Sequence, residues 1–189
     1  MYDFNADGNQ PSGRFELLPV GTYRLQLKIR SGGAGPDGVL RLAKNLNTLM
    51  LDTELIVVEG PHKGRKLWQL FTVDLNEQQK AAVDQEQWSK YETAVRIGRK
   101  RLGAVLNSAY SLRADDDSEE AQEKRRVESL QAFDGLTFYG RVGIRSGNGS
   151  YRDQNQLVEV LTPDNWMYPK PAAKAIVPIA EEMDDGIPF

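Results

Sequence analysis

The 189-residue sequence contains no cysteine, only one histidine and no long apolar run. The lack of cysteine excludes disulfides, iron–sulfur clusters, thiolate metal sites and cysteine nucleophiles. His62 alone excludes a multi-histidine metal centre, and a histidine-based triad would have to use it. The longest apolar stretches, such as the one ending at Val58, are far shorter than the roughly 20 residues of a membrane-spanning helix. Residues 1–7 lack the layout of a signal peptide, so we expect a soluble, cytoplasmic protein.

The charged residues are unevenly distributed along the chain. There are 24 Lys and Arg against 27 Asp and Glu, for a net charge of −3. Residues 181–189 hold four of the acids and residues 115–123 hold six, and neither segment contains a base. Setting these ten acids aside leaves 24 bases against 17 acids, a net charge of +7. Acidic blocks are typical of solvated or interacting segments. The negative net charge of the whole chain therefore does not exclude an anionic partner for the rest of it.

The hydrophobic pattern predicts three strands, a helical region and two further strands. Apolar and polar residues alternate in the strand segments, as expected when one face is buried. In the helical region apolar residues recur at spacings of 3, 4 and 7, and four Lys or Arg residues cluster at 96–101. The predicted strands cover about 20–30, 48–58, 65–75, 136–145 and 154–161, and the predicted helical pieces cover about 76–110 and 119–132.

Glycine and proline residues predict where loops and turns separate these elements. Residues 31–45 contain four glycines and a proline, which predicts a long flexible loop, and residues 59–64 predict a tight turn. Gly98 and Gly103 weaken the prediction that the first helical piece is one uninterrupted rod, because glycine has a low helix propensity. Five of the nine prolines follow residue 161, so we expect residues 162–189 to form an extended, disordered tail.

The order of the elements is that of an OB-fold, a five-stranded Greek-key barrel with a helix between its third and fourth strands. We therefore predict a mainly β protein with an OB-like domain over residues 1–161. Its helical insertion covers about 76–132, and a proline-rich linker with an acidic tip follows over 162–189. An α+β sandwich with the same order of elements is the alternative.

Basic and aromatic residues share the predicted exposed faces of the strands and the adjoining loops. Proteins that bind single-stranded DNA combine a cationic groove for the phosphates with aromatic rings on which bases stack. Each residue taken alone could equally be a solvated cation or a ring packed at the rim of the barrel. The residues that we expect to contact a single strand are Arg24, Lys28, Arg30, Arg41, Lys44, Lys66, Trp68, Tyr139, Arg141, Arg145, Tyr151 and Arg152.

Motifs with catalytic chemistry are weak. The acids of 115–120 could hold Mg²⁺ in a nuclease, but a metal site needs fixed and supported ligands, and this stretch is a predicted loop. Residues 31–35 lack the lysine of a phosphate-binding P-loop. His62 lies in a predicted turn, where a surface imidazole is expected. We therefore predict no enzyme activity, no cofactor and no metal site.

The last six residues carry the most specific motif, an aspartate pair followed by Gly-Ile-Pro-Phe. They resemble the C-terminal tip of bacterial single-stranded DNA-binding proteins. The resemblance implies a tip that recruits replication, recombination or repair proteins, with its ring in an apolar pocket and its carboxylates facing Lys or Arg. The tip residues concerned are Asp184, Asp185, Ile187, Pro188 and Phe189.

Residues 2–75 and 134–161 resemble small single-stranded DNA-binding proteins of phages and mobile elements, through segments 2–5, 18–23 and 59–65. This resemblance implies an OB-like core that coats and protects single strands in a bacterial cell or phage-infected host, and a homo-oligomer. The long helical insertion departs from the ordinary bacterial pattern and could block the interfaces of the bacterial tetramer. An adaptor or inhibitor that binds protein through the barrel, without binding DNA, is the alternative.

Overall fold

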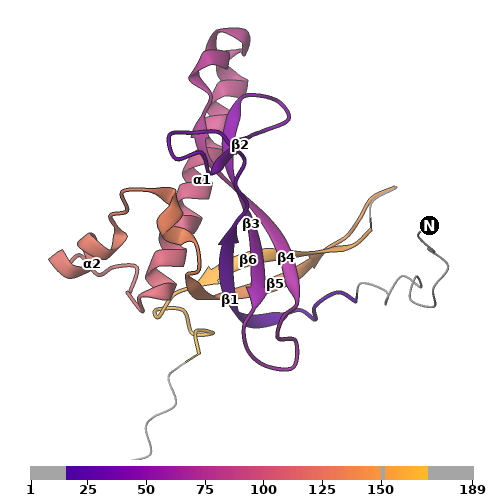
Figure 1. Ribbon diagram of the computed structural model, residues 1–189, viewed down its shortest axis with the longest axis vertical. Coiled ribbons are helices and arrows are strands. Elements are labelled where there is room, and N and C mark those ends of the chain that lie inside the picture. Colours follow the sequence, from indigo (N-terminus) through magenta and orange to yellow (C-terminus); the bar gives the residue numbers. More distant parts are fainter. Residues whose placement is uncertain (1–15, 150–151, 170–189) are drawn as a thin grey trace, which may run out of the picture.

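Six strands form one antiparallel sheet, with a long helix against it, in the computed structural model (Figure 1). The structure describes residues 16–149 and 152–169. The prediction of a mainly β protein with a helix is therefore confirmed. The strands are β1 (Gly21–Ile29), β2 (Leu40–Leu42), β3 (Thr48–Val57), β4 (Lys66–Leu75), β5 (Thr137–Arg145) and β6 (Gln154–Leu161). The helices are α1 (Gln85–Ala109) and α2 (Glu119–Arg125), with short 3₁₀ turns η1 (Glu77–Ala82) and η2 (Leu130–Phe133).

Strand pairing follows the path β4-β3-β1-β5-β6, and β2 joins the sheet beside β3. Along one edge of β3, β2 pairs with residues 49–51 and β1 with residues 53–57. Along its other edge, β4 pairs with residues 48–56. β1 and β2 therefore lie end to end. β4 and β6, the two ends of the path, contact each other, so the sheet curls around its apolar side.

The core lies inside this curl, as the strand alternation predicts. Leu25 and Leu27 of β1 are fully buried, whereas Arg24 and Lys28 on either side of this pair are exposed. Phe71, Phe138 and other buried residues of the strands meet an apolar side of α1 formed by Leu102, Val105 and Leu106. Burying each such side chain contributes about 1.5–3 kcal/mol before the cost of ordering the chain. The helix is thus part of the core.

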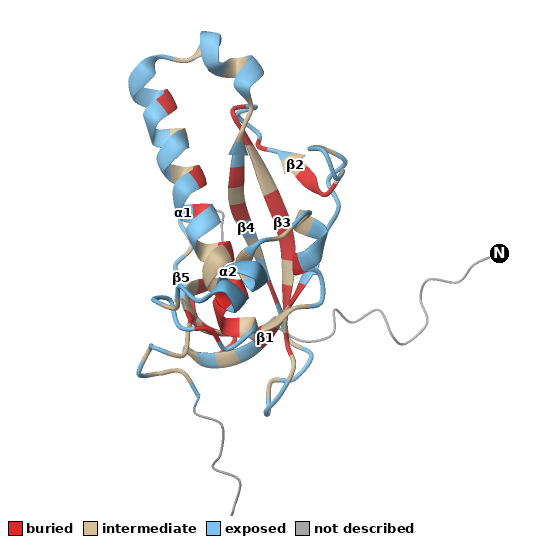
Figure 2. Ribbon diagram, turned by 90° about the vertical axis from the view of Figure 1, so that its left-hand side faces the viewer, coloured by how far each residue is buried: buried red, intermediate tan, exposed pale blue. Residues whose placement is uncertain are grey.

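α1 runs for 25 residues without a break, through both Gly98 and Gly103. Its N-cap residue is Asp84, whose side chain accepts a hydrogen bond from the Gln87 backbone N–H at 2.8 Å. A Cβ on Gly98 would lie 1.8 Å from the carbonyl oxygen of Thr72 on β4, so this glycine permits close contact between helix and strand. The buried positions of α1 follow the side that faces the sheet, and its outer side is exposed (Figure 2).

Three other segments differ from the sequence-based prediction. The predicted flexible loop 31–45 contains β2, because its apolar residues pair with β3 despite the surrounding glycines. The second predicted helical piece is two short elements, α2 and η2. Residues 162–169 were expected to be extended, but they form turns, with the Asn165 N–H donating to the Thr162 carbonyl at 2.8 Å. The tip at 184–189 lies outside the described residues. In the part of the chain that is described, no helix has the length and apolar character needed to cross a membrane.

Candidate nucleic-acid interface

The register of the strands brings polar residues of four strands onto one outer face. Lys28 of β1 lies opposite Glu54 of β3, which in turn lies opposite Trp68 of β4. On the other side of β1, Arg24 lies opposite Tyr139 of β5. Directly opposite residues have Cβ atoms about 4.5–5.5 Å apart, so these side chains are neighbours. We call this surface the sheet face; its members are Arg24, Gln26, Lys28, Glu54, Ile56, Lys66, Trp68, Leu70, Thr137, Tyr139 and Arg141.

Trp68 is the large aromatic side chain on the β4 part of the sheet face. It is 55% exposed, and covering its apolar ring with a ligand would be favourable because the ring would leave water. Lys66 and Leu70 lie two residues away on either side and therefore on the same face of the strand. The sheet face thus presents an indole ring beside an ammonium group, the pairing expected where a base stacks and its phosphate is neutralised.

Carboxylates of neighbouring segments pair with the cations of the sheet face. The Lys66 Nζ lies 2.8 Å from the Glu54 Oε1, and the Arg24 Nη1 lies 3.4 Å from the Glu59 Oε2. The Glu54 side chain is 19% exposed and the other three side chains are more exposed than this. Ion pairs at the surface contribute only about 0–1 kcal/mol. A phosphate can therefore replace the carboxylate at small cost, while the pair holds the long cationic side chain over the strand.

Asp52 organises a second group of cations where β1 ends and β2 begins. Its side chain is only 9% exposed and lies 2.8 Å from the Arg41 Nη1 and 3.9 Å from the Arg30 Nη1. A carboxylate so far removed from water needs charged partners, so the two arginines also support the fold. The sequence predicted both arginines as binding residues, but Asp52 was not recognised as their partner.

The remaining predicted residues lie at the margins. Arg141 is half-buried, and its Nε is 3.4 Å from the Glu159 Oε2. Lys44 lies in the loop after β2, and Arg145 and Arg152 flank the tip of the β5–β6 hairpin, which extends away from the body (Figure 1). The structure does not bring these three to the sheet face, and Tyr151 lies outside the described residues.

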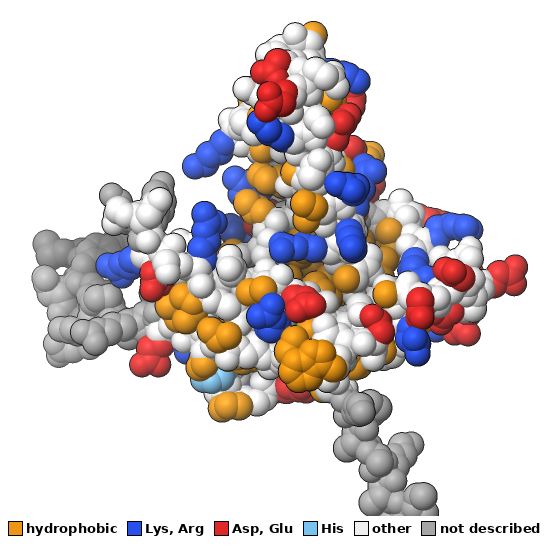
Figure 3. Space-filling view, turned by 180° about the vertical axis from the view of Figure 1, so that it is seen from behind, with side chains coloured by type: hydrophobic (Ala, Val, Ile, Leu, Met, Phe, Trp, Pro, Cys, Tyr) orange, Lys and Arg blue, Asp and Glu red, His pale blue; other side chains and the backbone are white. Residues whose placement is uncertain are grey.

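A second cationic surface lies on α1, from its exposed side to the edges where it meets β4 and β6. Arg96 and Lys100 are exposed and form no ion pair with any residue that the structure describes. Arg99 Nε donates to the Val73 carbonyl at 2.7 Å, and Arg101 Nη2 donates to the Val158 carbonyl at 3.4 Å. We call these four residues the helix ridge. Figure 3 shows Lys and Arg side chains gathered on the projecting helix and on the surface below it.

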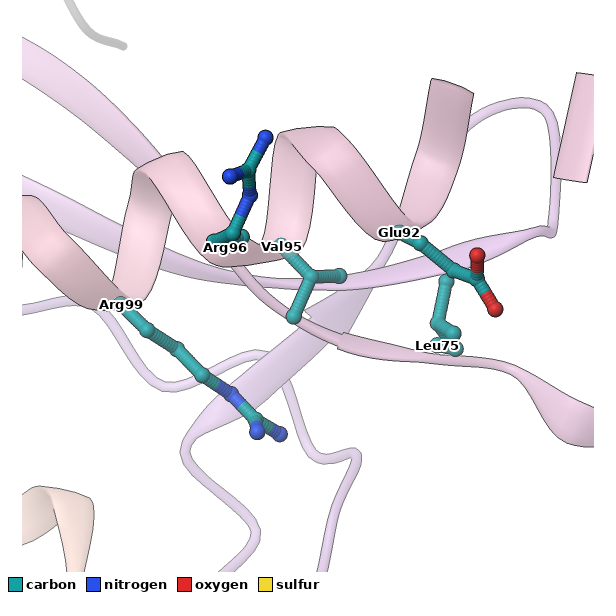
Figure 4. A pocket seen from close by; sticks show the side chains of 5 residues that line it. All are labelled: Leu75, Glu92, Val95, Arg96 and Arg99. Carbon is teal, nitrogen blue, oxygen red and sulfur yellow. The ribbon is translucent and has the colours of Figure 1, made fainter. Parts of the chain in front are cut away.

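A shallow hollow of about 330 Å³ lies between the helix ridge and the end of β4. Its lining is Leu75, Glu92, Val95, Arg96 and Arg99, and Figure 4 shows the two guanidinium groups pointing in different directions. A larger hollow of about 520 Å³ lies between α1, the loop before β2 and η2, over an apolar floor that includes Leu102 and Phe133. Neither lining includes a residue of the sheet face or a histidine.

The acidic segment 115–123 is held by contacts within the protein. Arg113 donates two hydrogen bonds to Asp115, which lowers the pKa of that carboxyl. The Ser118 side chain and backbone N–H lower the pKa of Asp116 in the same way. Within residues 16–149 and 152–169, no cluster of three or more His, Asp or Glu side chains is arranged to hold a metal ion. His62 is half-buried beside the Tyr23 ring, with centroids 6.0 Å apart.

Comparisons with known proteins do not assign the chain to a family. No protein-family model matches it, and no curated protein matches it. The resemblance of its segments to single-stranded DNA-binding proteins therefore stays a prediction. The function has to follow from the two cationic surfaces and the exposed rings.

Two features of these surfaces were not predicted as binding residues. The first is the helix ridge, although its four cations at 96–101 were a visible signal in the sequence. The second is Trp166, which is 87% exposed on the turn after β6. It was missed because the surrounding prolines predicted an extended tail rather than an ordered turn.

Proposed function

We propose that this protein binds single-stranded DNA on the sheet face. The observation that carries the proposal is the row formed by Lys28, Glu54 and Trp68 across three strands, with Lys66 beside the ring. Stacking of a base on such a ring contributes about 1–3 kcal/mol, and the two ammonium groups suit the adjoining phosphates. The net charge of +7 outside the two acidic segments favours the same partner.

The proposed architecture is an OB-like barrel with β2 as an addition. Five strands pair in the order β4-β3-β1-β5-β6, and α1 lies between β4 and β5 in the sequence. Contact between β4 and β6 supports near-closure of the barrel. In the OB-fold the second and third strands form the oligonucleotide-binding face. Without β2 these strands are β3 and β4, and β4 carries Trp68.

We assign the protein a role in coating and protecting single strands, without enzyme activity, as a homo-oligomer. The tip at 184–189 would recruit replication, recombination or repair proteins through its carboxylates and terminal ring. Deleting residues 181–189 should leave DNA affinity unchanged or raised, because a competing acidic segment is removed, while binding of the partner is lost. A clear loss of DNA affinity would contradict these separate roles for the sheet face and the tip.

The deciding experiment is a titration of the full chain with fluorescently labelled oligo-dT at two salt concentrations. We expect binding with partial quenching of tryptophan emission, and an affinity that falls as salt rises by about 0.7 in log–log slope for each phosphate neutralised. Lys66→Ala should reduce both affinity and slope. Lys90→Ala, which removes an exposed α1 lysine paired with Glu86 at 2.8 Å, is the matched control and should change neither.

Other outcomes of this titration lead to different functions. No binding at either salt concentration would reject the proposal in favour of an adaptor that binds protein through the same barrel. Degradation of the oligonucleotide after addition of Mg²⁺ would instead indicate a nuclease.

A further inference from the structure

Trp166 has the highest exposed fraction, 87%, of the large apolar side chains in the described residues, yet the turn that carries it is ordered by hydrogen bonds. The Asn165 side chain donates to the Glu159 Oε1 at 3.1 Å and accepts from the Met167 N–H at 3.0 Å. The Tyr168 N–H donates to the Asn165 carbonyl at 2.9 Å. A ring presented on a fixed turn can bind a ligand with little loss of conformational entropy.

This turn is joined to the sheet face through two tyrosines. The rings of Tyr139 and Tyr168 meet edge to face, with centroids 5.2 Å apart and an angle of 78° between their planes. The Tyr168 hydroxyl also donates to the Ser108 carbonyl of α1 at 3.2 Å. The turn is therefore packed between the β5 part of the sheet face and the end of α1.

A cation lies on the same route. Arg141 follows Tyr139 on the same face of β5 and contacts one oxygen of Glu159, while the other oxygen accepts from Asn165. Glu159 thus connects the guanidinium group to the residue that precedes Trp166. From β1 to the turn, Arg24, Tyr139, Arg141 and Trp166 alternate positive charge with aromatic rings.

We propose that Trp166 stacks on a base of the bound single strand, so that the nucleic-acid site continues from the sheet face over the turn 162–169. The inference rests on the proposed function and extends it to a residue outside the strands. Nucleic acid is the favoured occupant because Arg24 lies opposite Tyr139, and Glu159 connects Arg141 to the residue before Trp166. A polyanion with aromatic bases complements this alternation of cations and rings.

The experiment separates the tryptophans by substitution. The chain has three, and Trp88 is buried with 1% exposure, so Trp68→Phe leaves Trp166 as the one exposed indole among the described residues. Binding is followed by anisotropy of labelled dT₂₀, and quenching of tryptophan emission is recorded in the same titration. We expect Trp68→Phe to retain clear quenching at saturation, and the double variant Trp68→Phe/Trp166→Phe to lose it.

Affinity gives an independent readout. Trp166→Ala should weaken binding of dT₂₀ about fivefold or more, since the ring is lost without disturbing the core. Ile97→Ala, which removes a 51% exposed apolar side chain from α1, is the control and should bind as the natural chain does. The inference is overturned if the natural chain binds dT₂₀ but the quenching does not depend on Trp166 and Trp166→Ala binds with unchanged affinity. The sheet-face proposal would then still stand. Absence of anisotropy change in the natural chain overturns both.

Discussion

The sheet face and the helix ridge both carry cations, but they differ in what surrounds the charge. On the sheet face, Lys66 and Arg24 pair with carboxylates placed by strand register and by the β3–β4 turn. On the ridge, Arg96 and Lys100 have no ion-pair partner among the described residues. Arg99 of the ridge does pair with Asp74, at 3.1 Å, but the ridge carries no carboxylate of its own, and of the two surfaces only the sheet face has large aromatic rings. This difference suggests that the sheet face fixes the position of a bound strand, while the ridge adds longer-range attraction.

The largest expected effect comes from Gly98→Ala, which would push α1, with the helix ridge, away from β4 of the sheet face. The new Cβ would lie 1.8 Å from the Thr72 carbonyl oxygen, so α1 must move away from β4. We expect a loss of about 3 kcal/mol or more in the free energy of unfolding, because backbone atoms cannot give way as a side chain can. Urea unfolding measures this change.

Gly103 is the matched control within the same helix. A Cβ there meets nothing within 4 Å, so Gly103→Ala should stabilise the protein by up to about 1 kcal/mol through helix propensity. Equal stabilities of the two variants would mean that α1 does not pack on β4 as described.

The second effect is confined to the sheet face. Trp68→Ala should weaken oligo-dT binding by about 1–3 kcal/mol through the loss of stacking, while leaving the unfolding free energy nearly unchanged since the ring is 55% exposed. Trp68→Phe should retain a substantial part of the affinity because it keeps an aromatic ring. If alanine binds as well as phenylalanine does, the ring does not stack on a base.

The strands were predictable because their signal is local. In β1, Leu25 and Leu27 alternate with Arg24 and Lys28, and that alternation alone assigns each side chain to the core or the exposed face. The three residues of β2 are too few for their alternation to predict a strand, and their place depends on pairing with β3. In the sequence Gly98 only weakened the prediction of a continuous helix, because the contact that requires a glycine there, with the Thr72 carbonyl, is made by another element.

The candidate site was predictable only as a set of residues. Alternation placed Lys66 and Trp68 outward, but the position of Glu54 opposite Trp68 requires the register of β3 and β4. For the same reason the pairing of the cations was not foreseen. Trp166 depends on hydrogen bonds between Asn165 and Glu159 and on ring packing between Tyr168 and Tyr139. Such contacts between separate segments leave no local pattern in the sequence.

A third prediction tests the pairing itself. Glu54→Gln removes the carboxylate that holds Lys66 at 2.8 Å and leaves the ammonium group available to phosphate. We expect oligo-dT affinity to rise by about 0.5–1 kcal/mol, the scale of an exposed ion pair. Glu86→Gln breaks a pair of the same length, 2.8 Å from Lys90 on α1, and should leave affinity unchanged. A fall in affinity for Glu54→Gln would mean that the ion pair is needed to position Lys66.

The smallest expected effect concerns pH and the turn that carries Trp166. The Ala114 N–H donates to Asp164 at 3.1 Å, and this hydrogen bond holds the pKa of the Asp164 carboxyl below its ordinary value, against the opposing effects of burial and, to a smaller extent, of Asp115. A carboxyl whose pKa is lower in the folded state stabilises that state above the unfolded pKa, about 3.9 for Asp, and loses this contribution as the pH falls through the folded pKa. Acid should therefore release the turn from residue 114.

Asp164→Asn keeps an oxygen that can accept from Ala114 but does not titrate. The difference in unfolding free energy between the natural chain and this variant should be constant above about pH 5 and should shift against the natural chain below pH 4. A difference that stays constant down to pH 3 would show that Asp164 does not couple the turn to the body.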